Sequence, residues 1–248
     1  MTTWRLEWLR LIRTRRWIAL FAVYLFFGML GPVIARYMAQ LMERVQSEIT
    51  IIVPPPQPKD GVVNYLSQVG QIGLIVVVVI AAGALAFDAR RGVSTFLRTR
   101  TTNMWRLVLP RVVVPASAAV LAYAIGLAAA WYGTALLIGP LPAAPMLGGL
   151  LCESLYLIFA VAVVAAAASF ARSTLGTVGL GLGVLIAASA AGTIGALHDW
   201  LPTSLAGAPV DLLRTADLTD YLPALVTCVV TSVALVAVAV LRLRRREI

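Results

Sequence analysis

Six apolar runs, separated by short polar or basic segments, constrain this chain more than any other feature. A helix rises about 1.5 Å per residue, so about 20 apolar residues cross a hydrocarbon core of about 30 Å. Backbone amides must be paired internally there, so even the β-branched run at residues 74–80 is predicted to be helical. The predicted spans cover residues 17–35, 65–87, 107–138, 146–170, 175–197 and 224–241.

The composition agrees with this pattern. Hydrophobic residues make up 60% of the chain and charged residues 12%, and the mean hydropathy is +0.91. These values are typical of an all-α polytopic membrane protein, here with one transmembrane domain over residues 1–248. The net charge of +9 comes from arginines beside the apolar runs. It therefore favours anionic membrane lipids, not nucleic acid, as the partner.

The distribution of basic residues predicts the orientation. Six spans place both termini on one side, together with sixteen of the twenty basic residues. The other side holds only Arg36, Arg44, Lys59 and Arg214. By the positive-inside rule, both termini are predicted to lie in the cytoplasm.

Two segments outside the spans are predicted to lie at the membrane surface. Residues 1–16 place Trp4 and Trp8 on one side of a helix and Glu7 and Arg10 on another, which is typical of an interfacial amphipathic helix. No signal-peptidase site follows, so we expect this helix to be retained. Prolines divide residues 198–223 into short pieces, which we interpret as short re-entrant helices at the outer surface.

The loop between the second and third spans is strongly basic. Residues 88–111 hold six arginines and one acid. At about 100° per residue, a helix here gathers the apolar residues on one arc and the polar ones opposite. The apolar arc comprises Val93, Phe96, Leu97, Met104, Leu107 and Val108, and the opposite face comprises Arg91, Thr95, Arg98, Thr102 and Arg106. Lipid binding explains the arginines but not the apolar arc, so residues 88–106 are predicted to dock on something else.

Catalytic and metal-binding patterns are not found in the sequence. The only lysine, Lys59, lies in an outer loop, so no phosphate-binding Gly-Lys-Ser or Gly-Lys-Thr motif exists. The single histidine, His198, and the two cysteines, Cys152 and Cys228, do not form a metal-ligand pattern. We expect this chain not to be an enzyme and to bind no metal or cofactor itself.

Glu153 is the only acidic residue within a predicted span. It lies about seven residues, or about 10 Å, from the outer end of the fourth span. A charge buried there requires a partner or a water-filled cavity. Glu153 therefore lines a substrate path, forms a structural pair with Arg36, or extends to the outer headgroups, and the sequence leaves these alternatives open.

This layout resembles the permease subunits of ABC-2 type transporters, which have the type V ABC exporter fold. The resemblance rests on a basic N-terminal helix containing Glu7, Arg10 and Arg13, six spans, a cytoplasmic loop after the second span, and broken helices before the sixth. The family's loop has an acidic residue, a Gly-Thr pair and then a basic segment. The corresponding residues here are Asp88, Arg90, Arg91, Gly92, Val93, Ser94, Thr95, Leu97, Arg98, Thr99 and Arg100. Aspartate replaces the usual glutamate, and Val93 and Ser94 separate the glycine from the threonine.

The resemblance implies an exporter that moves a hydrophobic or amphiphilic drug, lipid or peptide across a bacterial cytoplasmic membrane. Two copies of a separate ABC ATPase would bind ATP and Mg²⁺, and a second permease subunit, identical or homologous, would complete the path. Residues 88–106 would form the coupling helix, and Glu7, Arg10 and Arg13 would belong to a connecting helix. The implied ATPase-docking residues are Asp88, Arg90, Arg91, Gly92, Val93, Thr95, Phe96, Leu97, Arg98, Arg100 and Met104.

Two other functions compete with this interpretation. An ATP-independent secondary transporter or channel predicts inverted repeats and several ionisable groups within the spans. The sequence offers Glu153 alone and no evident repeat. A non-transporting membrane anchor that recruits a cytoplasmic partner through the basic loop is the other alternative.

Overall fold

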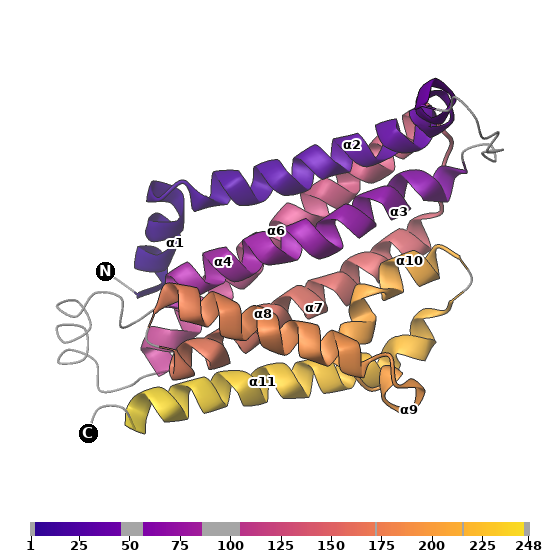
Figure 1. Ribbon diagram of the computed structural model, residues 1–248. Helices are drawn as coiled ribbons and strands as arrows, with labels where there is room; N and C mark the ends of the chain where they lie inside the picture. The colour runs from indigo at the N-terminus through magenta and orange to yellow at the C-terminus, as the bar shows by residue number, and fades with distance from the viewer. Residues whose placement is uncertain (1–2, 46–56, 86–104, 172, 215, 246–248) are drawn as a thin grey trace.

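The computed structural model describes residues 3–45, 57–85, 105–171, 173–214 and 216–245. Within these ranges the chain is helical without a strand, and six helical segments are long and apolar enough to cross a membrane (Figure 1). The predicted all-α membrane fold with six spans is confirmed. The segments are α2 (Arg16–Val45), α3 with η1 and α4 (Pro58–Leu85), α6 (Trp105–Leu137), α7 (Ala143–Phe170), α8 (Thr174–Ala191), and η4 with α11 (Leu218–Arg245).

Several helices begin or end away from the limits of the apolar runs. The second span begins at Pro58 and not at residue 65, because Pro58 occupies the first turn and the Gln57 amide donates to Asp60 Oδ2 at 2.8 Å. The fifth span ends at Ala191 and not at residue 197, with Gly192 as its C-cap. Helix α2 extends beyond residue 35 to Val45. Capping groups set the start of the second span and the end of the fifth, whereas hydropathy locates only the apolar part of each helix.

The spans alternate in direction, so the bundle has two distinct ends (Figure 1). We call the basic end the one that holds α1 (Thr3–Arg13), the last residues of α4 and the first residues of α6. The C-terminal residues of α11 reach the same end. The opposite end holds α9 (Gly195–His198), η3 (Pro202–Ala206), α10 (Ala208–Leu212) and η4 (Leu218–Tyr221).

Helix α7 is the most buried span and packs against α4, α6, α8 and α11. Helix α2 packs closely on α6, and glycines make this approach possible. A Cβ added to Gly28 would collide with the carbonyl oxygen of Gly126, and one added to Gly126 would lie 2.6 Å from the carbonyl oxygen of Tyr24. Small residues that allow close backbone contact stabilise helix pairs in lipid, where apolar burial contributes little.

The second span contains a π-helical turn. This turn, η1 (Val69–Gly73), separates α3 (Pro58–Gln68) from α4 (Leu74–Leu85). Its last residue faces α2, since a Cβ on Gly73 would lie 3.0 Å from the hydroxyl oxygen of Tyr24. Single π-helical turns occur often at functional sites. The π-helical turn of this protein lies beside Tyr24, in the interior of the bundle.

Candidate functional site

Helix α1 packs against the first turns of α6 at the basic end. Glu7 and Leu11, one helical turn apart, face the bundle, while Trp4 and Trp8 are exposed. Arg111 of α6 donates from Nε to Glu7 Oε1 at 2.9 Å, and their side chains are only 9% and 12% exposed. The predicted interfacial helix is therefore fastened to the third span by a largely buried ion pair.

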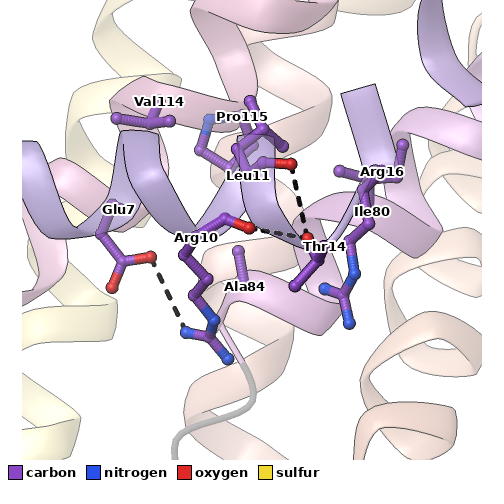
Figure 2. Close-up of a pocket in the computed structure, with 9 residues that line it drawn as sticks. All are labelled: Glu7, Arg10, Leu11, Thr14, Arg16, Ile80, Ala84, Val114 and Pro115. Atoms are coloured by element: carbon purple, nitrogen blue, oxygen red, sulfur yellow. Dashed lines mark hydrogen bonds and ion pairs between the residues drawn. The ribbon is translucent and has the colours of Figure 1, made fainter. Parts of the chain in front are cut away.

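The other two predicted connecting-helix residues differ in their contacts. Arg10 lies one turn from Glu7, with 3.7 Å between its Nη1 and Glu7 Oε2, and Figure 2 shows it turned toward that carboxylate. Arg13 is exposed in the last turn of α1. Its charge there is favourable for the helix dipole. Glu7 is thus shared between an exposed arginine on its own helix and a buried one on α6.

A sharp bend joins α1 to α2. Arg15 has φ of 54°, in the left-handed region that residues other than glycine seldom adopt. The Thr14 hydroxyl donates to the Arg10 carbonyl oxygen at 2.7 Å and so supports the end of α1 (Figure 2). After the bend, a guanidinium nitrogen of Arg16 lies against Gly83 of α4, where a Cβ would collide with it. The bend therefore lets α1 pack against α6 while Arg16, at the start of α2, contacts α4.

A hollow lies under this bend, between α1, α4 and α6 (Figure 2). It encloses about 290 Å³, including space open to solvent. Its lining combines charged and apolar side chains: Glu7, Arg10, Leu11, Thr14, Arg16, Ile80, Ala84, Val114 and Pro115. The hollow adjoins the two helix ends between which the predicted coupling loop runs.

That predicted loop lies mostly outside the described residues. The implied docking residues there are Asp88, Arg90, Arg91, Gly92, Val93, Thr95, Phe96, Leu97, Arg98, Arg100 and Met104. Its last residues, Trp105 and Arg106, are described and form the first turn of α6, where both are exposed. The coupling helix therefore stays a prediction.

Glu153 lies in the interior of the bundle, where it is 5% exposed. It is ten residues beyond Ala143, the start of α7, so it lies about 15 Å along that helix. Arg36 is exposed, and among the described residues neither it nor any other cation forms an ion pair with Glu153. Because it is buried, Glu153 also does not extend to the outer surface. Neither structural alternative considered for this residue is observed.

Four tyrosines lie within electrostatic reach of Glu153. With it they form what we call the tyrosine–glutamate cluster: Tyr24, Tyr65, Tyr123, Tyr156 and Glu153. Tyr123 stacks on Tyr65 with ring centroids 6.1 Å apart and meets the edge of Tyr24 at 6.2 Å. The Tyr65 hydroxyl donates to the Tyr123 carbonyl oxygen at 3.1 Å. The buried hydroxyls of Tyr24 and Tyr123 have no hydrogen-bond partner among the described residues.

The segment before the last span packs onto the opposite end of the bundle. The Tyr221 hydroxyl donates to Asp211 Oδ2 at 3.1 Å, and the Thr227 hydroxyl donates to the Trp200 carbonyl oxygen at 2.6 Å. A Cβ on Gly149 of α7 would lie 3.0 Å from Pro209. The described residues contain no group of three His, Cys, Asp or Glu side chains placed to hold a metal ion.

Two parts of this arrangement were not predicted from the sequence. Arg111 is predicted as one of the loop arginines, but it is a buried residue of α6 and the partner of Glu7. The sequence does indicate that Arg111 belongs to a helix within the membrane bundle, because it follows residue 107, the predicted start of the third span. The tyrosines near Glu153 were also not predicted from the sequence. The only indication in the sequence is that tyrosines, which carry a polar hydroxyl, occur within apolar runs.

Comparisons with known proteins agree with the membrane fold and leave the family unassigned. No protein-family model matches the chain. The chain is similar to the uncharacterized transmembrane protein YxlG of Bacillus subtilis (strain 168), with 23% identity over 248 residues. The similarity covers 97% of this chain and 95% of YxlG, so it extends over all six spans. With six candidate spans and a transmembrane relative along its whole length, this chain is a multi-pass membrane protein.

Proposed function

We propose that the chain is the membrane-spanning permease subunit of an ATP-driven exporter of the ABC-2 type. The observation that carries the proposal is the attachment of α1 to α6 through Glu7 and Arg111. A purely interfacial helix needs no such pair, because lipid headgroups would satisfy its charges. A helix that transmits movement from a partner to the spans needs a rigid attachment.

The position of α1 supports this role. It lies beside the last turn of α4, through the hollow lined by Ala84, and beside the first turns of α6. Those two helix ends flank residues 86–104, which contain the proposed ATPase-docking segment. A partner seated on that segment could therefore move α1, α4 and α6 together as one unit, as rigid-body switching requires.

The energy source is proposed to be a separate protein. The only lysine of the chain, Lys59, lies in the first turn of α3, at the end opposite α1. By the positive-inside rule the basic end faces the cytoplasm of the bacterial cell, where two ATPase subunits with ATP and Mg²⁺ would bind. The chain itself is proposed to perform no catalysis.

A second permease subunit is supported by the exposed face of α8. Gly179 and Gly183, one turn apart, have open space where a Cβ would be. A Gly-x-x-x-Gly pair on an exposed face is typical of close helix association in membranes. We propose that α8 contributes to contact with a second copy or a homologous chain. The substrate is proposed to be a hydrophobic or amphiphilic drug, lipid or peptide.

The proposal predicts that an ABC ATPase is encoded beside the gene, and co-purification of the chain with that ATPase tests it. Aspartate at Phe96, Leu97 and Met104 together is expected to abolish the complex and any stimulated ATP turnover, because charges would replace the apolar docking face. Thr102→Asp, on the opposite face of the predicted helix, is the matched control and is expected to retain both. Size-exclusion profiles identify variants that do not fold. Retained binding and turnover in a folded triple variant would show that residues 88–106 are not the coupling helix.

The buried Glu153 favours a second candidate, an ATP-independent secondary transporter. Liposomes containing this chain alone distinguish the two functions. Substrate movement driven by a proton gradient, without an ATPase, supports secondary transport. Movement that requires the ATPase and ATP supports the exporter.

A further inference from the structure

Glu153 is a buried carboxyl group that has no counter-charge among the described residues. It is 5% exposed, and the described residues give it neither an ion pair nor a hydrogen bond. An ionised carboxylate in hydrocarbon that lacks both is strongly unfavourable, whereas the neutral acid is tolerated. The surroundings of Glu153 therefore favour the protonated, neutral form of its carboxyl group over the carboxylate.

The groups that interact electrostatically with Glu153 support this conclusion. They are Tyr24 from α2, Tyr65 from α3, Tyr123 from α6, and Tyr156 and Cys152 from α7 itself. Cys228 of α11 and Tyr221 of η4 approach the cluster through Cys152. All of these side chains are neutral or become negative on ionisation, so none of them stabilises a carboxylate by opposite charge.

Two of these tyrosines have hydrogen-bonding capacity that the described residues do not use. The hydroxyls of Tyr24 and Tyr123 are fully buried without a partner. A buried unpaired hydroxyl is unfavourable, so each one requires an explanation, and a functional role is one of the known explanations. The Tyr24 hydroxyl also lies beside Gly73, at the end of the π-helical turn that interrupts the second span. The unpaired hydroxyl of Tyr24 thus lies beside the irregular turn of the second span.

We propose that Glu153 is a proton-binding site inside the membrane bundle, and that Tyr24 and Tyr123 are its positioning residues. In the conformation described here the carboxyl holds the proton. When the helices shift and water enters, the O–H bond of the acid breaks and the proton passes to water. The carboxylate that remains accepts hydrogen bonds from the two tyrosine hydroxyls, and no other bond changes.

This inference does not rest on the proposed exporter function. The ligand is a proton, and the site consists of residues within one chain. An ATP-driven exporter, a secondary transporter and a membrane anchor could each contain it. Loss of ATPase binding in the loop variants would leave it unchanged.

Infrared difference spectroscopy tests the site directly. The full chain, in nanodiscs of ether lipids that lack ester carbonyls, is expected to show the C=O stretch of a protonated carboxylic acid at neutral pH, shifted in D₂O. Glu153→Gln is expected to lose this band. Asp199→Asn is the matched control and is expected to keep it, because the Asp199 side chain is 75% exposed and lies outside the buried interior of the bundle. A wild-type protein without the band, or a Glu153→Gln protein that retains it, overturns the proposal.

The frequency of the same band tests the role of the tyrosines. This second test does not require the Glu153→Gln protein to fold. Tyr24→Phe and Tyr123→Phe are each expected to shift the C=O frequency, because they remove a hydroxyl dipole near the acid. Tyr37→Phe changes an exposed tyrosine of α2 and is expected to leave the band in place. If neither Tyr24→Phe nor Tyr123→Phe moves the band, these tyrosines are not positioning residues.

Discussion

The guanidinium of Arg111 and the carboxylate of Glu7 lie 2.9 Å apart, although 104 residues separate them in the sequence. Both side chains are mostly withdrawn from the surface. In a low-dielectric site, each charge depends on the other for compensation. The ion pair therefore makes α1 part of the folded bundle as well as a helix at the membrane surface.

Glu7→Gln is expected to lower the thermal stability and to release α1. Removing one partner of a buried pair leaves the other charge uncompensated, at a cost of about 3–5 kcal/mol. When α1 is no longer held against α6, trypsin should cleave the chain faster at Arg13 and Arg15, in the bend between α1 and α2. Melting temperature and tryptic half-life in detergent measure both effects. Arg5→Gln, at an exposed position on the same helix, should change neither the melting temperature nor the rate of cutting at the bend.

Exchange of the two charges provides a stricter version of this test. The double variant Glu7→Arg/Arg111→Glu is expected to recover part of the stability lost in each single variant, because opposite charges again face each other. Additive losses in the double variant would mean that the pair does not hold α1.

Tyr24→Phe and Tyr65→Phe are expected to have opposite effects on stability. The Tyr24 hydroxyl is buried and has no hydrogen-bond partner among the described residues, so its removal should stabilise the fold by about 1–3 kcal/mol. The Tyr65 hydroxyl donates to the Tyr123 carbonyl oxygen, so its removal should cost about 0.5–1.5 kcal/mol. Unfolding in SDS titrations measures the difference. A Tyr24→Phe protein less stable than the wild type would show that its hydroxyl has a partner.

Gly126→Ala is expected to destabilise the contact between α2 and α6. The added methyl group would lie 2.6 Å from the Tyr24 carbonyl oxygen, which is backbone and cannot rotate away. Overpacking of this kind costs about 1–3 kcal/mol. Gly70→Ala is the control, because open space surrounds a Cβ at Gly70. Equal melting temperatures for the two variants would contradict the close approach of these helices.

Leucine at Gly179 and Gly183 is expected to weaken association between permease subunits. The two glycines leave a shallow face on α8, and leucine side chains would hold a second helix away. Subunit association in mild detergent can be followed by chemical crosslinking and by sedimentation. Val184→Leu, elsewhere on the exposed surface of α8, serves as the control. Unchanged association of the double variant would place the subunit contact on another helix.

The amphipathic pattern around Glu7 predicted the N-terminal helix, and the structure has α1 at Thr3–Arg13. The same pattern could not identify Arg111 as the partner of Glu7. Hydropathy and charge describe each segment alone, and the pairing of two charges depends on how α1 bends at Arg15 and on which span it then meets.

The sequence by itself determined the number of spans and the helical class, because a long apolar run in lipid must pair its backbone amides within one helix. It also located Glu153 within a span, but not the groups around it. Only the tertiary structure decided that Tyr24, Tyr65 and Tyr123 come together from three other helices, within electrostatic reach of Glu153. That convergence depends on close contacts such as the one between Gly28 and Gly126, and packing geometry between helices is not encoded in the periodicity of any single run.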